Sequence, residues 1–303
     1  MKTGSLILGT RGSQLALWQA NFIKQILISK FNCKSEIKVI KTTGDKMDDV
    51  SFDKLEGKGF FTKELEDALI GKDVDLVVHS LKDLMTTQPN GLKLGAVGFR
   101  VDRREVLLIN KTKFEDGNLI PVKAGSIIGT SSARRKCQIT YHAPTLEIKD
   151  MRGNVPTRVK KLRDGLYDAI IIAAAGIDRL ELDLSDLKVI RMDPDKFLPA
   201  PAQGVLGIQI RDNDQRTESI IGQLNSPEVV METSLERGLL AKFDAGCTLP
   251  LGVYSTISDK QLKLTAILGQ SKDNCWVGMR RIEETGNNTE KIVDALYNKL
   301  IVE

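Results

Sequence analysis

The sequence predicts an α/β protein with two similar lobes and a third, smaller α+β domain toward the C-terminal end. Three observations predict this. An apolar run, a Gly-Thr turn and a helical pattern follow one another within residues 5–27 and recur within residues 126–139. A helix followed by a buried strand also occurs twice. After residues 225–227 (Asn-Ser-Pro) the pattern changes to a helix, a loop and alternating strands.

The repeated corner is clearest when the two stretches are compared. SLIL at 5–8 predicts a strand, GTRGS at 9–13 a tight turn, and QLALWQANFIKQIL at 14–27 a helix with apolar residues at helical spacing. SIIGTSSARRKCQI at 126–139 repeats this order. A second repeated pattern links TKELEDALIGKDVDLVV at 62–78 with TRVKKLRDGLYDAIII at 157–172. Each stretch predicts a helix with a Gly near its end, then an Asp and a buried strand.

The remaining segments connect the lobes and form the third domain. FLPAPAQGVLGIQI at 197–210 has turn residues before an apolar strand, which indicates a crossing from the second lobe back to the first. ETSLERGLLAKF at 232–243 predicts a helix and DAGCTLPLG at 244–252 a loop. LKLTAIL at 262–268 predicts a strand, and KIVDALYNKLIV at 291–302 predicts a final helix.

Composition excludes several classes of protein. The formal net charge of +4 is too balanced for a nucleic-acid coat or a membrane-surface protein. No apolar run approaches the roughly 20 residues that span a bilayer, and SLIL is too short for a signal-peptide core, so we expect a cytoplasmic protein with no membrane partner. Four dispersed cysteines without a CxxC pair and only two histidines argue against a metal site.

Cations and hydroxyls gather where strands lead into helices. In open α/β sheets a ligand lies beyond the carboxyl ends of the strands, so residues after VVHS, GTRGS and GTSS are expected to line a common cleft. Arginine binds carboxylates through two parallel hydrogen bonds, which favours a ligand with several carboxylates or phosphates. The alternative is that these charges are ordinary solvated surface residues. The cations concerned are Arg11, Lys54, Lys58, Lys82, Arg134, Arg135, Arg152, Arg158 and Arg179.

Two further residues are candidates for chemistry. Asp83 is a carboxylate among cations and can hold a proton beside a cationic intermediate, or it can be a helix cap or an ion-pair partner. Cys247, in the loop AGCTLP, can be a nucleophile or an attachment point, or simply a structural thiol. Spacing alone leaves both alternatives open.

A set of motifs distributed along the whole chain resembles the porphobilinogen deaminase (hydroxymethylbilane synthase) family. Nine motifs occur in the family's order: GTRGSQLALWQ, KTTGD, GKGFFTKELEDAL, DLVVHSLKDL, GTSSARR, RGNVPTR, AAAGIDRL, LPAPAQG and AGCTLPLG. The resemblance implies two lobes like those of type II periplasmic binding proteins plus a small α+β C-terminal domain. It implies domain 1 at 1–99 and 204–223, domain 2 at 104–199 and domain 3 at 227–303.

The resemblance also implies a transferase of tetrapyrrole biosynthesis. Such an enzyme carries one covalent dipyrromethane cofactor, joins four porphobilinogen molecules to it with loss of ammonia, and releases hydroxymethylbilane by hydrolysis. Each step passes through an azafulvene cation. Asp83 matches the catalytic carboxylate and Cys247 the attachment residue, and the family favours a monomer. Porphobilinogen bears acetate and propionate groups, which accounts for the cations.

The resemblance assigns further residues by position. Cofactor binding falls to Ser80, Lys82, Asp83, Thr130, Ser131, Ser132, Arg134, Arg135, Arg152, Gly153 and Arg158. Substrate binding falls to Arg11, Ser13, Lys54, Lys58, Arg152, Asn154, Arg158, Arg179 and Gln203, with Lys54 and Lys58 in a mobile loop over the cleft. The chain departs from the family at Met85, Ala202, Gln209 and Ala245, which concerns loop geometry.

Two other functions remain alternatives. A lobed receptor that captures a small anion without transforming it needs the cations but no loop thiol. A thiol enzyme such as a peroxidase needs a free Cys247. A covalent adduct on the purified protein distinguishes the deaminase from both.

Overall fold

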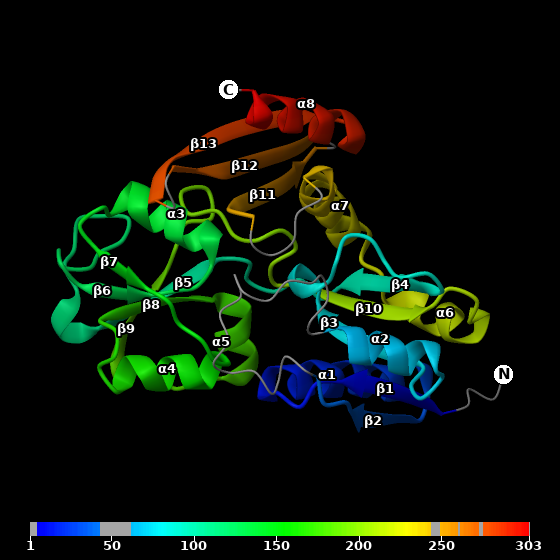
Figure 1. Ribbon diagram of the computed structural model, residues 1–303. Helices are drawn as coiled ribbons and strands as arrows, with labels where there is room; N and C mark the ends of the chain where they lie inside the picture. The colour runs from blue at the N-terminus through cyan, green and yellow to red at the C-terminus, as the bar shows by residue number, and fades with distance from the viewer. Residues whose placement is uncertain (1–4, 43–61, 244–248, 260, 273–274, 303) are drawn as a thin grey trace. The chain divides into compact units, whose positions relative to one another are not determined.

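The structure is a computed structural model, and it describes residues 5–42, 62–243, 249–259, 261–272 and 275–302. The chain divides into two compact units (Figure 1). The first unit, residues 1–101 and 204–230, is called lobe 1. The second unit, residues 102–203 and 231–303, contains two sheets. Its part at 102–203 is called lobe 2 and its part at 231–303 the C-terminal domain.

Lobe 1 is built on a five-stranded mixed sheet. The central strand β3 lies between β1, to which it is parallel, and β10, to which it is antiparallel. The strand order is β2 (Ser35–Val39), β1 (Leu6–Thr10), β3 (Leu76–Ser80), β10 (Leu206–Arg211) and β4 (Leu92–Gly98). The helices are α1 (Gln14–Phe31), α2 (Lys63–Ile70) and α6 (Gln215–Ile221), followed by a 3-10 turn at Gly222–Leu224.

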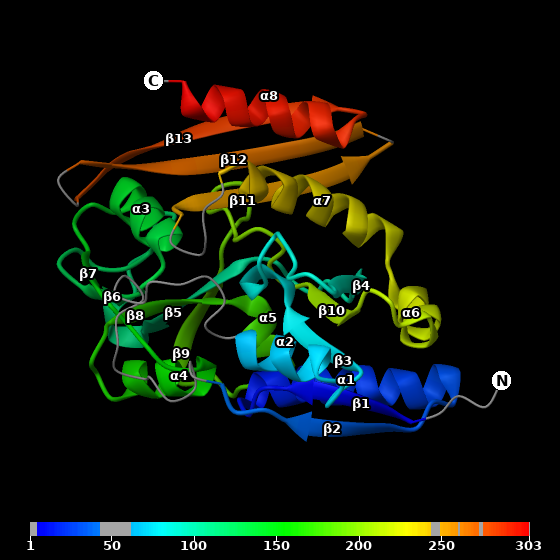
Figure 2. The same ribbon diagram turned by 45° about the vertical axis from the view of Figure 1, so that its right-hand side comes forward.

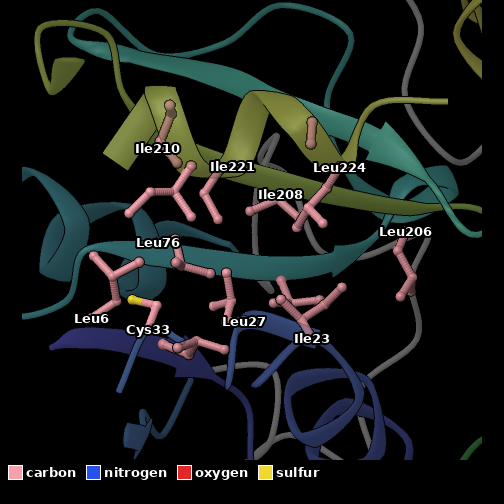
Figure 3. Close-up of a cluster of buried hydrophobic side chains, with 14 residues drawn as sticks. Leu6, Ile23, Leu27, Cys33, Leu76, Leu206, Ile208, Ile210, Ile221 and Leu224 are labelled. Carbon is pink, nitrogen blue, oxygen red and sulfur yellow. The ribbon is translucent and has the colours of Figure 1, made fainter. Parts of the chain in front are cut away.

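The main core of lobe 1 lies between its sheet and α1. Figure 3 shows Leu76 and Ile208 of neighbouring strands beside Ile23 and Leu27 of α1. Their burial stabilises the lobe by roughly 1.5–3 kcal/mol for each fully buried aliphatic side chain. The segment at 197–210 leads the chain from lobe 2 back to lobe 1, as predicted from its turn residues, and ends in β10. The sheet of lobe 1 is therefore completed by a strand that follows lobe 2 in the sequence.

Lobe 2 repeats this arrangement. The strand order is β7 (Glu147–Lys149), β6 (Ile127–Gly129), β8 (Ala169–Ala173), β5 (Glu105–Asn110) and β9 (Leu187–Arg191). As in lobe 1, three neighbouring strands are parallel and the fourth strand of the order is antiparallel to both of its neighbours. The helices are α3 (Ala133–His142), α4 (Val155–Arg163) and α5 (Ala174–Leu180). The two repeated corners in the sequence therefore occupy equivalent places in two sheets of the same order.

The C-terminal domain is a three-stranded antiparallel sheet with helices. Helix α7 (Pro227–Lys242) begins in the last residues of lobe 1 and continues into this domain. The other elements are β11 (Leu251–Ser258), β12 (Gln261–Lys272), β13 (Cys275–Gly286) and α8 (Thr289–Ile301). Figure 2 shows α8 lying along the sheet, where Leu296 and Leu300 join Leu235 and Leu264 in the core. Helix α7 begins at Pro227, before the predicted start at Glu232, because proline is well tolerated in a first helical turn.

The sheet of this domain packs against α3 of lobe 2. Gly269 makes the approach possible, since a Cβ at this position would lie 2.8 Å from both the Cβ and Sγ of Cys137. Cys137, Leu198 and Ile267 form the small core of this contact. Burial raises the pKa of the Cys137 thiol to about 11, so this cysteine is a small apolar side chain rather than a reactive one.

Two lobes of the same build and a small α+β domain confirm the fold class predicted from the sequence. Ala202, one of the departures from the family pattern, adopts a left-handed backbone with φ of 59°. Its N–H donates to Oε2 of Glu236 at 2.7 Å, which anchors the turn. Within the described ranges, no helix is both long and apolar enough to cross a membrane.

Candidate functional site

Lobe 1 has a pocket of about 110 Å³ at the carboxyl ends of β1 and β3. Four of the residues assigned from the sequence line it together. They are Arg11, Ser13, Ser80 and Asp83. The other lining residues are Leu15, Ala16, Gln19, Thr62, Leu65, Val78 and His79.

The corner between β1 and α1 places Arg11 at this pocket. The Ser13 hydroxyl caps α1 by accepting a hydrogen bond from the Ala16 N–H at 3.3 Å, and the Thr10 hydroxyl donates to the Ala16 carbonyl at 3.0 Å. These bonds fix the turn, so a half-buried guanidinium and the N-terminal end of α1 face the same pocket. Both favour a negatively charged ligand.

Strand β3 carries the carboxylate to the pocket. It ends at Ser80, and a short 3-10 turn at Leu81–Asp83 follows. Leu81 is fully buried and its N–H donates to the Val205 carbonyl at 3.0 Å, which anchors the turn to the lobe. Asp83 is exposed at the end of this turn. The buried strand therefore ends in polar groups because it emerges at the edge of the sheet where the pocket lies.

Gln19 and Ser80 join α1 to β3 at the base of the pocket. Nε2 of Gln19 donates to the Ser80 hydroxyl at 2.7 Å, and Gln19 is only 2% exposed. Sequence reasoning missed Gln19, although a signal was available. It lies three and four residues after Ala16 and Leu15 on one face of the predicted helix, and a glutamine on such a face requires a polar partner.

His79 was also missed as a lining residue. Its Nε2 lies 3.1 Å from Oε1 of Gln209, whose Nε2 in turn donates to Gln88 at 2.9 Å and Glu66 at 3.3 Å. Burial lowers the pKa of His79 to about 4, the bond to Gln209 raises it, and the charge of Arg11 lowers it further. His79 is therefore neutral at physiological pH.

Lobe 2 gathers its own set of donors at the ends of β6 and β7. The Thr130 N–H donates to the Lys149 carbonyl at 2.9 Å. The Ser131 hydroxyl donates to the Met151 carbonyl at 3.0 Å and accepts from its N–H at 2.9 Å. The segment Thr130–Ser132 before α3 thus lies beside the segment 150–154 before α4, and the N-terminal ends of two helices meet at one edge of the sheet.

The turn before α4 has a specific geometry. Gly153 has a φ of 112°, and a Cβ there would lie 2.8 Å from Cγ2 of Thr157. Asn154 caps the helix by accepting from the Thr157 N–H at 3.0 Å. Nε of Arg158 donates to the Gly153 carbonyl at 2.7 Å. Arg152 and Arg158 are partly exposed at this turn, where they can reach a ligand.

Arg134 and Arg135 have a different environment. Both are buried, and both donate to the fully buried carboxylate of Glu105, at 2.6 and 2.7 Å. Arg134 also donates to the Leu198 carbonyl at 2.8 Å, and Arg135 to the Ile171 carbonyl at 2.9 Å. Sequence reasoning missed Glu105, whose signal was a charge at the start of the apolar run EVLLI. Both guanidinium groups therefore bind a buried carboxylate inside lobe 2.

The remaining assigned residues lie as follows. Arg179 of α5 is buried, and burial lowers its pKa to about 10, so it stays cationic at neutral pH. Gln203 is buried and its Nε2 donates to the Arg103 carbonyl at 2.9 Å. Lys82 is partly exposed beside Asp83. Lys54, Lys58 and Cys247 lie outside the described residues, as does Ala245.

Comparisons with known proteins identify the family. Residues 6–219 match the family model "Porphobilinogen deaminase, dipyromethane cofactor binding domain", and residues 230–301 match "Porphobilinogen deaminase, C-terminal domain". The porphobilinogen deaminase of Sulfurimonas denitrificans is 42% identical over 266 residues, covering 87% of this chain and 83% of that protein. That of Maridesulfovibrio salexigens is 37% identical over 310 residues, covering 97% and 99%.

Solved structures give a more distant likeness. The periplasmic VFT2 domain of Bordetella pertussis BvgS has a TM-score of 0.46 and 10% identity, covering 73% of this chain and 86% of that one. A periplasmic substrate-binding protein of an ABC transporter from Coxiella burnetii has a TM-score of 0.44 and 14% identity, covering 77% and 97%. The two family models together span nearly all of the sequence, and the chain belongs to the porphobilinogen deaminase family.

Proposed function

We propose that this chain is an active porphobilinogen deaminase, a transferase that joins four porphobilinogen molecules head to tail on a covalently bound dipyrromethane. Ammonia is lost at each condensation, and hydrolysis releases hydroxymethylbilane. The observation that carries the proposal is the pocket of lobe 1, where Asp83 lies with Arg11 and Ser13 at the ends of two parallel strands. This places an acid beside donors for the carboxylates of the substrate.

Each lobe, taken by itself, has groups that suit the carboxylates of the cofactor. Dipyrromethane carries acetate and propionate groups, which require cations and N–H donors. In lobe 2 the N-terminal ends of α3 and α4 lie with Arg152 and Arg158, and in lobe 1 Arg11 lies with the N-terminal end of α1. When bound, the cofactor supplies the free α-carbon of a terminal pyrrole as the nucleophile.

Asp83 has the properties that the reaction needs. Its side chain is exposed at the end of a turn held by the buried Leu81, so its position is fixed while its oxygens can reach a ligand. A carboxylate accepts hydrogen bonds from pyrrole N–H groups and stabilises positive charge that develops on the rings. Arg11 binds a substrate carboxylate and thereby orients the reacting carbon.

The finer assignments belong to the same proposal. The chain works as a cytoplasmic monomer with domains at 1–99 with 204–223, at 104–199 and at 227–303. Cys247 holds the cofactor through a thioether. Cofactor contacts come from Ser80, Lys82, Asp83, Thr130, Ser131, Ser132, Arg134, Arg135, Arg152, Gly153 and Arg158. Substrate contacts come from Arg11, Ser13, Lys54, Lys58, Arg152, Asn154, Arg158, Arg179 and Gln203.

A turnover assay tests the proposal. Purified protein is incubated with porphobilinogen, and the loss of substrate, the release of ammonia and the formation of hydroxymethylbilane are followed together. We expect four ammonia molecules for each hydroxymethylbilane. Binding of porphobilinogen without any ammonia release would contradict the proposal and favour an anion-binding receptor.

A further inference from the structure

A chain of amide hydrogen bonds lies beneath the pocket of lobe 1, and it has a fixed direction. Nε2 of Gln88 donates to the Met85 carbonyl at 2.8 Å. Since a carbonyl only accepts, this contact sets the orientation of the Gln88 amide and leaves its Oε1 as the acceptor for Nε2 of Gln209, at 2.9 Å. Oε1 of Glu66 accepts from the same nitrogen at 3.3 Å.

This direction determines which nitrogen of His79 carries the proton. With its nitrogen turned toward two acceptors, Gln209 presents Oε1 to Nε2 of His79 at 3.1 Å. An amide oxygen has no proton to give, so Nε2 of His79 is the donor. The opposite amide orientation would set the Gln209 oxygen against the Glu66 carboxylate and the Gln88 oxygen, and it is therefore excluded.

The surroundings of His79 disfavour its cationic form. The ring is 8% exposed and Gln209 is fully buried. Arg11 lies on the corner after β1, and its charge lowers the pKa of His79 further below the value that burial sets. Glu66 of α2 is separated from the ring by the Gln209 amide, and Asp83 lies at the other end of the turn after β3. Neutral Gln19 faces the pocket from α1.

We infer that Gln209 is a positioning residue that fixes the tautomer of His79, with the proton on Nε2, while burial of the ring keeps it neutral and so keeps a second cation out of the pocket that contains Asp83. An imidazolium there would attract the Asp83 carboxylate and compete with the positive charge that the reaction develops. The consequence for turnover rests on the proposed function, whereas the tautomer itself does not.

Nitrogen-15 NMR of histidine-labelled protein tests the tautomer directly. The chain has only two histidines, His79 and His142, so a His142→Gln variant assigns both rings. We expect His79 to show a protonated Nε2 and an unprotonated Nδ1 from pH 5 to 8. A proton on Nδ1, or a titration midpoint near the ordinary value of about 6.5, would overturn the inference.

A charge-conserving exchange tests the role of Gln209. The double variant Gln209→Glu with Glu66→Gln moves the carboxylate next to His79 without changing the net charge of the lobe. We expect the His79 midpoint to rise by about two pH units or more, because a hydrogen-bonded carboxylate favours the imidazolium. Gln209→Leu, a neutral control, should leave His79 neutral but let its tautomers mix. An unchanged His79 in the double variant would contradict the role.

Turnover then separates this inference from the proposed function. Below its raised midpoint, the double variant should lose about tenfold or more in kcat/KM for porphobilinogen, with recovery at higher pH. Gln209→Leu should keep the pH profile of the unaltered enzyme. If the unaltered enzyme shows the expected NMR spectrum but no turnover, the proposed function fails and the tautomer assignment stands. If the double variant titrates as expected but its kcat/KM does not fall, the effect on Asp83 is wrong.

Discussion

Glu105 and Arg134 form a buried ion pair of 2.6 Å inside lobe 2, and the neighbouring Arg135 completes it at 2.7 Å. The carboxylate is fully buried, so each guanidinium that faces it compensates a charge that has no access to water. The sequence motif GTSSARR places these arginines next to hydroxyl residues that the family resemblance assigns to cofactor binding. Their own side chains, however, tie α3 to β5 and to the Leu198 carbonyl.

Arg134→Leu and Arg152→Leu should therefore fail in different ways. Arg134→Leu leaves Glu105 poorly compensated and should lower the free energy of unfolding by about 3–5 kcal/mol. Arg152→Leu changes a partly exposed side chain, so it should shift stability by about 0.5 kcal/mol or less while still blocking cofactor assembly or chain extension. Urea unfolding and intact mass measure the two effects. A fully stable Arg134→Leu protein that lacks the cofactor would show that Arg134 binds the ligand itself.

Asp83→Ala should retain the cofactor and the stability of the protein but lose turnover. The side chain is exposed, so its removal costs little folding energy. The loss of charge stabilisation should lower kcat by about 100-fold or more. Asp212→Ala, which removes another exposed carboxylate of lobe 1, is the matched control and should keep full activity. Normal turnover of porphobilinogen by Asp83→Ala would remove Asp83 from the catalytic role.

Ser80→Ala should destabilise lobe 1 through Gln19. Removal of the hydroxyl takes away the acceptor of a buried amide, which costs about 1–3 kcal/mol. Adding Gln19→Leu to Ser80→Ala should restore most of this stability, because an apolar pair leaves no buried donor unpaired. Thermal unfolding of the two variants measures the difference. An additive loss in the double variant would argue against the Gln19–Ser80 bond.

Stability should fall as the pH is lowered through the range in which His79 resists protonation. The pKa of His79 is about 4 in the folded protein, against the ordinary histidine value of 6.5 in the unfolded chain, so only the unfolded chain takes up this proton between these values. Stability from the neutral ring is fully present above about pH 6.5 and is lost toward pH 4. One pKa unit corresponds to about 1.4 kcal/mol, so the free energy of unfolding should fall by about 3 kcal/mol over this pH range.

Urea unfolding at several pH values measures this dependence. His142→Gln should retain the His79 contribution to it, since His142 lies in the other compact unit. A His79→Phe protein should lose that contribution. If the free energy of unfolding depends on pH in the same way in the His79→Phe protein and in the unaltered protein, the buried ring is not the source of the pH dependence.

The sequence was sufficient for the fold class because the same local pattern occurs twice. SLILGTRGS and SIIGTSS both form a strand, a turn and the start of a helix, since their apolar runs and turn residues agree with the final structure. The antiparallel position of β10 in the sheet of lobe 1 could not be predicted, because it depends on a pairing with β3 across more than a hundred residues.

The site was only partly predictable for the same reason. The place of Arg11 and Ser13 follows from the corner after β1. That Ser80 and Asp83 lie at the end of β3 follows from the buried strand, whereas their roles came from the family resemblance. The role of Arg134 depends on Glu105, and that of His79 on Gln209, partners that are distant in the sequence. Local spacing identifies which side chains are near a strand end, whereas contacts with distant partners decide which of them are buried and which line the pocket.

The most direct test of the central claim is the intact mass of the untreated protein. A porphobilinogen deaminase should carry a covalent adduct derived from two porphobilinogen units on every active molecule, and a Cys247→Ser variant should lack it. Full occupancy by this adduct, with its loss in the variant, is the predicted result. The unmodified mass in protein that still turns over porphobilinogen, or a freely alkylated Cys247 in active protein, would contradict the account.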